Sequence, residues 1–331
     1  MSNVKKPWPQ NESAGVIDRR DWLRRATGFL GGLATGGFGL AQAQGLASGS
    51  AALFPGFRTS KVQTAGATIN VVIGGQGPPL LLLHGAPQTH ASWHKVAPEL
   101  AKEYTVVAAD LRGYGDSSKP ADGVNHLNYS KRAMAQDQVE VMRSFGFTQF
   151  AVVGHDRGGR VTHRMALDHP TSVTKAAVLD IVPTHYIYKH VTREFATAYY
   201  HWFFLIRPAP FPETLLNNSI EFYIGTDGGA AQAEYLRCFK DPATVHAMCE
   251  DYRAGASIDL EHDEADLNRA VTCPLLVLWG EQGNVGRLYD VLTVWRERAS
   301  KVSGKGLPGG HNLQYDLPDQ TLAELRAFLR S

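Results

Sequence analysis

The chain has 331 residues, of which 44% are hydrophobic and 20% charged, a composition typical of soluble globular proteins. Its length suits one large α/β domain or one domain with a sizeable insertion. A formal net charge of +1 argues against nucleic acid or an anionic membrane as a partner. Three cysteines without a CxxC spacing argue against a metal-binding or disulfide-rich scaffold. We expect free thiols, with a Cys238–Cys249 bridge as the open alternative.

Residues 1–43 have the features of an export signal. Paired arginines at 19–20 and 24–25 precede the short, glycine-rich apolar run Phe29–Leu40 and the small-residue site Ala41-Gln42-Ala43. The pattern resembles a twin-arginine signal and predicts cleavage after Ala43, with export to the periplasm or the medium. Because the apolar run is too short to span a bilayer, we expect no stable membrane anchor after cleavage. The alternative is a basic amphipathic segment that stays attached to a membrane surface.

From residue 60 onward, strand and helix patterns alternate. The stretches 61–64 and 68–73 predict a β-hairpin, and the continuous apolar run Leu80–Leu83 is typical of a strand buried on both faces. Further strands are predicted at 104–109, 150–154, 175–179, 274–280 and 301–307, and helices at 93–101, 130–145, 158–169, 289–299 and 318–329. This alternation predicts a mostly parallel sheet with helices on both faces.

The alternation stops between residues 183 and 270. This segment is rich in aromatic residues at helical spacing and shows no clear strand pattern. We interpret it as a helical cap inserted into a core formed by residues 44–182 and 271–331. Most of its aromatic side chains are expected to pack the cap against the core.

The motif Gly154-His155-Asp156-Arg157-Gly158 lies between a predicted strand and a predicted helix. This is the context of a nucleophile elbow, which in α/β-hydrolases usually exposes a serine. A carboxylate that attacks a saturated carbon forms an ester, which water can then cleave, whereas serine would form an inert ether. Asp156 as nucleophile therefore predicts a carbon–halogen or epoxide substrate. The alternative is a chance turn, since glycine and aspartate are common in turns.

Residues elsewhere in the chain can complete a catalytic triad around Asp156. His311 lies between the last strand and the last helix, where a base would be placed to activate water. Asp180 directly follows the predicted strand 175–179, so its carboxylate would lie on the functional edge of the sheet and orient His311. Glu281 is the reserve candidate for the orienting acid.

Backbone and guanidinium groups are expected near the same turn. The loop that begins at His84 follows a buried strand, so the backbone N–H of Ala86 and that of Arg157 are candidates for an oxyanion hole. The alternative for this loop is an ordinary Gly-Pro turn. Arg157 and Arg160, three residues apart on the elbow helix, can face the pocket and bind an anionic substrate. The alternative for the two arginines is surface ion pairing.

Seven stretches form a set of motifs: His84–Thr89, Ala109–Ser117, Gly154–Arg160, Asp180–Thr184, Tyr200–Trp202, Cys249–Gly255 and Asp259–Asp263. Together they resemble the motifs of the haloacetate dehalogenases, including the fluoroacetate dehalogenases, within the α/β-hydrolases. The resemblance covers most of the chain after the signal and departs from the family's HGFP form at Ala86, which stands in place of Phe.

The resemblance implies a role for each motif residue. Asp156 would be the nucleophile, His311 the base and Asp180 its orienting acid. Arg157 and Arg160 would bind the substrate carboxylate. His201, Trp202 and Tyr252 would form the halide pocket. It further implies a small anionic substrate, no metal or organic cofactor, and a homodimer.

The resulting hypothesis is hydrolysis of a 2-haloacid such as haloacetate to the 2-hydroxy acid and halide. The main rival is an epoxide hydrolase, in which cap tyrosines would protonate the epoxide oxygen; the candidates are Tyr199, Tyr200, Tyr223 and Tyr252. The arginine pair argues against this rival, because a neutral epoxide would leave both guanidiniums unpaired in the pocket. A third possibility is a non-catalytic module that binds a ligand in the hydrolase shell.

Overall fold

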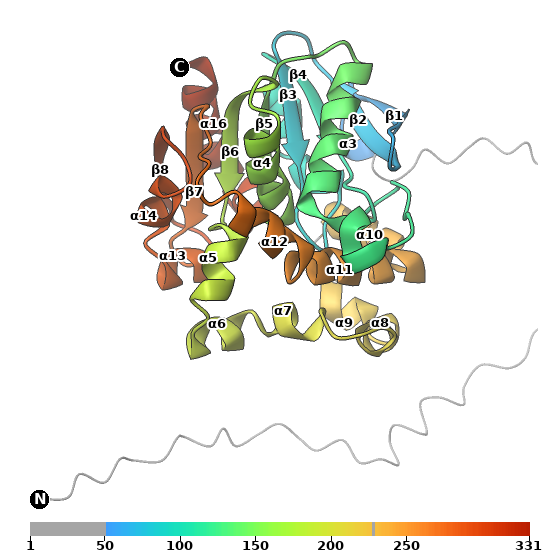
Figure 1. The fold of residues 1–331 in the computed structure, drawn as a ribbon. Coiled ribbons are helices and arrows are strands. Elements are labelled where there is room, and N and C mark those ends of the chain that lie inside the picture. The colour runs from blue at the N-terminus through green and yellow to red at the C-terminus, as the bar shows by residue number, and fades with distance from the viewer. Residues whose placement is uncertain (1–50, 227–228) are drawn as a thin grey trace, which may run out of the picture. The chain divides into compact units, whose positions relative to one another are not determined.

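Within residues 51–226 and 229–331, which the computed structural model describes, eight strands form one sheet in the order β1-β2-β4-β3-β5-β6-β7-β8 (Figure 1). The hairpin strands β1 and β2 pair antiparallel, as does β2 with β4, and the other pairings are parallel. The mostly parallel sheet is thus confirmed. The strands are β1 (Arg58–Gln63), β2 (Thr68–Gly74), β3 (Pro79–Leu83), β4 (Thr105–Ala109), β5 (Phe150–His155), β6 (Val173–Leu179), β7 (Leu275–Gly280) and β8 (Val302–Leu307).

Each face of the sheet has its own hydrophobic core, which explains the continuous apolar runs in the sequence. Leu81 and Leu83 of β3 pack in one core with helices α3, α4 and α14, whereas Leu80 and Leu82 pack in the other with α2 and α16. Successive strand residues point to opposite faces, so a strand covered on both sides is apolar throughout. These helices are α2 (Ala97–Leu100), α3 (Lys131–Ser144), α4 (Arg157–Asp168), α14 (Val291–Arg296) and α16 (Pro318–Arg330).

The chain leaves the sheet after β6 and returns to it at β7. The intervening segment is helical, and its described residues contain no strand. In Figure 1 these helices gather beyond the end of the sheet at which β5 and β6 finish. They therefore cover the edge where residues that follow the parallel strands meet. The helices are α5 (Thr184–Lys189), α6 (Arg193–Ala198), α7 (Tyr200–Phe204), α8 (Phe211–Asn217), α9 (Ile220–Ile224), α10 (Gly229–Phe239), α11 (Pro242–Gly255) and α12 (Ile258–Ala265).

Two helix predictions were wrong in extent. The stretch 93–101 forms the 3-10 helix η2 (His90–Trp93) and then α2, because Pro98 lacks a backbone N–H and fits only the first turn of a new helix. The stretch 289–299 becomes helical only after Asp290, whose carboxylate caps α14. The remaining short helices are η1 (Ala51–Leu53), η3 (Val124–Tyr129), α13 (Asn284–Leu288) and α15 (Leu313–Asp316).

The structure also bears on the cysteines and on the membrane. Cys238, Cys249 and Cys273 are free, so the alternative of a Cys238–Cys249 bridge is wrong. In the part of the chain that the structure describes, no helix combines the length and the hydropathy needed to cross a bilayer. The predicted export signal and its cleavage site lie outside the described residues.

The turn from β5 into α4 requires glycine on both sides of Asp156. A β-carbon on Gly154 would lie 2.3 Å from the carbonyl oxygen of Gly158, and one on Gly158 would lie 2.4 Å from the carbonyl oxygen of Leu83. Both neighbours are backbone atoms of packed elements and cannot rotate away. The close approach of β3, β5 and α4 at this turn therefore depends on the missing side chains.

Replacing Gly158 with alanine should lower the free energy of unfolding by about 1–3 kcal/mol, because the added methyl group overlaps the β3 backbone. Gly310→Ala is a matched control, since a β-carbon there meets nothing within 4 Å. The control should change stability by less than about 0.5 kcal/mol. Urea unfolding of the full chain measures both variants, and an equal loss in the two would contradict the packing argument.

Candidate active site

Asp156 sits at the tip of the turn in a left-handed backbone conformation, with φ of 46°. Such a conformation is strained for a residue with a side chain and persists only where the surroundings enforce it. One carboxylate oxygen, Oδ1, accepts hydrogen bonds from the backbone N–H of Arg157 (2.6 Å) and of Ala86 (3.3 Å). The two N–H groups expected to form an oxyanion hole thus converge on a single oxygen of Asp156.

The imidazole of His311 connects Asp156 with Asp180. Its Nδ1 lies 2.6 Å from Oδ2 of Asp180, and its Nε2 lies 3.7 Å from Oδ2 of Asp156. Asp180 is buried, and its other oxygen accepts a hydrogen bond from the backbone N–H of Gly280 (2.9 Å). Glu281, the reserve candidate, is exposed and its side chain lies next to Gly306. The carboxylate that contacts His311 is therefore that of Asp180.

The charges of this group favour an ionised Asp156. Burial alone would raise the pKa of Asp156, but the positive charges of His311 and Arg160 outweigh it and lower the pKa to about 2. Burial would lower the pKa of His311, but the hydrogen bond and the negative charge of Asp180 outweigh it and raise that pKa. The arrangement combines a carboxylate that is ionised at neutral pH with a strengthened base.

Sequence reasoning missed the role of His155, which joins the turn to the loop that carries His311. Its Nε2 lies 2.9 Å from the carbonyl oxygen of His311, and its Nδ1 lies 3.2 Å from the side-chain oxygen of Gln88. Gln88 in turn donates a hydrogen bond to the side chain of Asn312 (2.9 Å). Burial lowers the pKa of His155 to about 3, so the ring is neutral. The position of His155 inside the elbow motif, next to Asp156, was the one feature of the sequence that could have indicated this role.

The contacts of Arg157 differ from those expected of a residue that only binds the substrate carboxylate. Its Nε and Nη2 donate hydrogen bonds to the two carboxylate oxygens of Asp251, at 2.9 and 2.7 Å, and Nη2 also donates to the Asp251 carbonyl oxygen (2.6 Å). Lys131 and Tyr114 also donate hydrogen bonds to this carboxylate. Among the described residues only Nη1 of the guanidinium lacks a hydrogen-bond partner. Arg157 therefore links the core to α11 of the cap, and its Nη1 is not used in this link.

Arg160 is buried beside Arg157 and is held by its own set of acceptors. Its Nη1 donates hydrogen bonds to the carbonyl oxygen of Val182 (3.0 Å) and to the hydroxyl of Thr184 (2.9 Å). Its buried Nε has no partner in the described part of the chain. The alternative of surface ion pairing is wrong for both arginines, since Arg157 is 1% and Arg160 6% exposed.

The three residues assigned to a halide pocket come together above the arginines. The ring centroid of Tyr252 lies 5.8 Å from that of His201 and 6.2 Å from that of Trp202. The Arg157 guanidinium lies 4.2 Å from the centre of the Tyr252 ring, and the Arg160 guanidinium lies 4.7 Å from that of Trp202. These cation–π contacts place the hydroxyl-bearing ring of Tyr252 next to Arg157 and the indole ring of Trp202, with its N–H group, next to Arg160.

These three side chains keep their polar hydrogens available. Trp202 and Tyr252 are buried, yet within the described part of the chain the side chains of Trp202, Tyr252 and His201 make no hydrogen bond. Burial lowers the pKa of His201 to about 4, so its ring is neutral at physiological pH. Burial also raises the pKa of Tyr252 well above its usual value, so its hydroxyl keeps its proton. The group can donate hydrogen bonds to an anion that forms beside it.

The cap tyrosines proposed for an epoxide hydrolase are not equally placed. Tyr200 is 61% exposed, whereas Tyr252 is buried over Arg157. Tyr199 is partly buried, and its ring stacks on that of Phe195 with centroids 5.0 Å apart. Tyr223 is also only partly exposed. The exposed Tyr200 is therefore a poor candidate for a proton donor inside the site.

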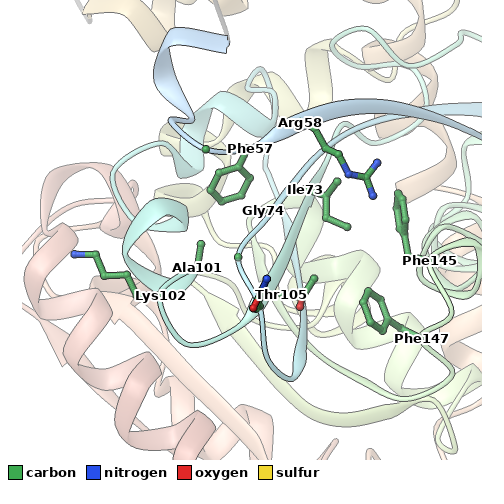
Figure 2. Close-up of a pocket in the computed structure, with 12 residues that line it drawn as sticks. Phe57, Arg58, Ile73, Gly74, Ala101, Lys102, Thr105, Phe145 and Phe147 are labelled. Carbon is green, nitrogen blue, oxygen red and sulfur yellow. The ribbon is translucent and has the colours of Figure 1, made fainter.

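A cavity of 330 Å³ opens beside the triad, lined among others by Ala86, Ile224, Tyr235 and His311. A cavity of 860 Å³ lies elsewhere, lined by residues that include Thr105, Phe145 and Phe147 (Figure 2). Thr105 begins β4, whereas the turn at Asp156 follows the end of β5, so the larger cavity belongs to the opposite edge of the parallel sheet. Of these two cavities, the smaller one borders the catalytic group, at His311 and Ala86.

Comparison with known proteins agrees with this geometry. The family model of the α/β hydrolase fold matches residues 78–318. A fluoroacetate dehalogenase from Burkholderia sp is 50% identical over 289 residues, which cover 84% of this chain and 95% of the relative. A soluble epoxide hydrolase from Corynebacterium sp. is 31% identical over 272 residues, covering 76% of this chain and 90% of that protein.

The solved structures include a provisionally assigned α/β hydrolase from Nostoc sp PCC 7120. It is 58% identical, superposes with a TM-score of 0.81, and the match covers 82% of this chain and 98% of that one. The fold, the family model and the identity over nearly the whole length of the dehalogenase point to one assignment. The chain belongs to the α/β-hydrolases and, within them, to the haloacetate dehalogenase family.

Proposed function

We propose that the protein hydrolyses the carbon–halogen bond of a 2-haloacid such as fluoroacetate, releasing halide and the 2-hydroxy acid. One observation carries the proposal: a carboxylate, Asp156, occupies the elbow and faces His311, which is paired with Asp180. Half of the aligned residues are shared with a fluoroacetate dehalogenase, whereas the epoxide hydrolase relative shares 31%.

In the first step, Oδ2 of Asp156 attacks the carbon that carries the halogen. The new carbon–oxygen bond forms as the carbon–halogen bond breaks, and the halide leaves with the bonding electron pair. Oδ2 is the attacking atom because Oδ1 is already held by the N–H groups of Arg157 and Ala86. The product of this step is an ester between Asp156 and the acid.

In the second step, His311 removes a proton from water, which attacks the carboxyl carbon of the ester. Negative charge then develops on Oδ1, where the two N–H groups stabilise it. The bond between the carboxyl carbon and Oδ2 breaks, and the proton held by His311 passes to the leaving alkoxide. The 2-hydroxy acid leaves with Oδ2, and Asp156 regains an oxygen from water as a carboxyl group. Because the pKa of Asp156 is about 2, this group releases its remaining proton to solvent and restores the carboxylate.

The remaining groups explain the choice of an α-halogenated acid. The free Nη1 of Arg157 and the guanidinium of Arg160 bind the substrate carboxylate. His201, Trp202 and Tyr252 donate hydrogen bonds to the departing halide. Because Tyr252 and Trp202 contact the two guanidiniums directly, the carboxylate and the halogen must be close neighbours in the substrate. An α-halo acid satisfies this condition.

Two further proposals concern the export of the protein and its oligomeric state. Residues 1–43 act as a twin-arginine signal, so that the reaction takes place in the periplasm or outside the cell. The chain acts as a homodimer. The sequence pattern supports the first proposal, and the family resemblance supports the second.

Removing the nucleophile should abolish halide release. With Asp156→Asn, we expect release of fluoride from fluoroacetate to fall by at least about a thousandfold, because an amide is a poor nucleophile. A fluoride-selective electrode measures the rate, and circular dichroism checks that the variant is folded. Formation of a diol from an aryl epoxide, with no fluoride release by the unmodified protein, would instead support an epoxide hydrolase.

The two steps should respond differently to pH. Asp156 is ionised above a pKa of about 2 and His201 is neutral above about 4, so the first release of fluoride should be independent of pH between about pH 5 and 8. Ester hydrolysis needs neutral His311, whose pKa is raised above 6.5, and should therefore slow as pH falls through that raised pKa. Rapid-quench kinetics separates the steps, and a first step with the same pH dependence would contradict these assignments.

Removing one donor from the halide pocket should slow fluoride release more than chloride release. Tyr252→Phe keeps the ring over Arg157 and removes only the hydroxyl group. Because fluoride concentrates more charge and leaves less readily, we expect the ratio of fluoride to chloride release to fall by about tenfold or more. Tyr200→Phe is the matched control, since Tyr200 is exposed. An unchanged ratio in Tyr252→Phe would remove Tyr252 from the halide pocket.

A further inference from the structure

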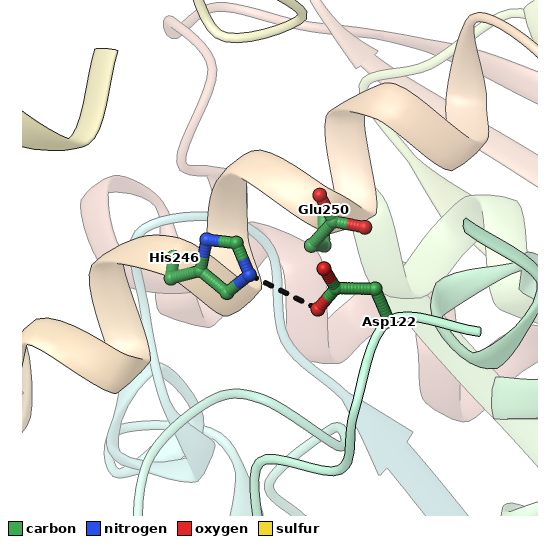
Figure 3. A group of neighbouring side chains, drawn as sticks. All are labelled: Asp122, His246 and Glu250. Atoms are coloured by element: carbon green, nitrogen blue, oxygen red, sulfur yellow. Dashed lines mark hydrogen bonds and ion pairs between the residues drawn. The ribbon is translucent and has the colours of Figure 1, made fainter. Parts of the chain in front are cut away.

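A second group of polar side chains joins the cap to the core outside the catalytic site. It consists of Asp122, His246 and Glu250 (Figure 3), and one donor atom from each lies within 4.8 Å of the other two. His246 and Glu250 are four residues apart on α11 and so lie on the same helix face. Asp122 comes from the core loop that precedes η3.

The imidazole of His246 is oriented as in many metal sites. Its Nε2 lies 3.0 Å from a carboxylate oxygen of Asp122, and its Nδ1 lies 3.0 Å from Oε1 of Glu213. Glu213, on α8, is 6% exposed, and its second oxygen is buried without a partner among the described residues. A carboxylate on the far side of a histidine ring fixes the ring and makes it a stronger ligand.

The charges around His246 leave an excess of negative charge. Three carboxylates, those of Asp122, Glu213 and Glu250, meet one guanidinium, that of Arg253, which lies 2.7 Å from Glu213 and 2.8 Å from Glu250. Burial lowers the pKa of His246, but the hydrogen bonds to Asp122 and Glu213 outweigh it and raise that pKa, so a bound cation would replace a proton of the ring. Once that proton has left, Arg253 balances only one of the three carboxylate charges. His126 also contacts Glu250, at 2.6 Å, but each carboxylate oxygen can accept a second partner. A divalent cation would balance this charge.

We propose that the protein binds Zn²⁺ through Nε2 of His246 and one carboxylate oxygen each from Asp122 and Glu250. One nitrogen and two carboxylate oxygens are common zinc ligands, and water would fill the fourth position of a tetrahedron. The side chains of Asp122 and His246 are 44% and 37% exposed, so the ion can enter from solvent. Mg²⁺ fits less well, because it prefers oxygen ligands alone.

Zinc at this position would fasten the cap to the core. Glu250 is followed directly on α11 by Asp251 and Tyr252, which hold Arg157 and contribute to the halide pocket. The ion would therefore hold in place the helix on which the substrate groups depend. It would take no part in the reaction, so the proposal stands independently of the proposed function.

Calorimetric titration with Zn²⁺ tests the proposal on the full chain, produced without a histidine tag and freed of metal by chelation. Residues 1–50 contain neither histidine nor cysteine, so that segment adds no strong zinc ligand. We expect one equivalent of Zn²⁺ to bind. The midpoint of thermal unfolding should rise by about 5 °C at a hundredfold excess of Zn²⁺ over Kd.

Variants assign the site. His246→Gln and Asp122→Asn should lose both the stoichiometric binding and the rise in Tm, whereas His190→Gln, which alters an exposed histidine on the cap, should keep both. The Tm of each variant with chelator shows whether it is folded, and the zinc-dependent increment is the quantity compared. Failure of the unmodified protein to bind one equivalent would overturn the proposal, as would equal binding by His246→Gln. Either result would leave His246 as a hydrogen-bonding link between Asp122 and Glu213.

Discussion

The active site depends on one constraint, the left-handed backbone of Asp156 at the end of β5. This conformation turns the chain so sharply that the first N–H of α4, that of Arg157, points at the aspartate's own carboxylate. The turn is possible because Gly154 and Gly158 let strand and helix backbones approach to distances that a β-carbon would prevent. Packing thereby enforces the strained backbone conformation of Asp156, as expected for a functional site.

The position of the carboxylate then determines the roles of its neighbours. Oδ1 is held by backbone N–H groups, which leaves Oδ2 toward His311 and the pocket. A serine at this turn could attack carbonyl carbons, but it could not be regenerated after attack on a saturated carbon. The exchange of one residue type on a common α/β-hydrolase frame thus accounts for a change in the class of substrate.

Helix α11 connects this turn to the cap. Asp251 binds the guanidinium of Arg157 through two hydrogen bonds to its carboxylate, and Tyr252 places its ring against the same guanidinium. Removing one partner of a buried ion pair leaves an uncompensated charge, so Arg157 and Asp251 hold α11 against the elbow. The geometry of the halide pocket relative to the nucleophile follows from this link.

The sequence was sufficient to predict the strands, the elbow and the pairing of Asp180 with His311, because these follow from local patterns and from the edge at which parallel strands end. It was not sufficient to predict that Asp251 binds Arg157. The partners are 94 residues apart, and nothing in the local pattern distinguishes a guanidinium that binds substrate from one that binds the cap. The sequence did not predict the contact between Asp122 and His246 for the same reason. Only the four-residue spacing of His246 and Glu250 could be read from it.

The mechanism requires a covalent ester between Asp156 and the substrate. A single turnover in water enriched in oxygen-18, with the enzyme in excess over fluoroacetate, tests it most directly. If the ester forms, the first glycolate carries unlabelled oxygen from Asp156, and mass spectrometry of the peptide containing Asp156 finds one labelled oxygen in its side chain. Labelled glycolate and an unlabelled Asp156 would instead show that water attacks the substrate directly and that no ester forms.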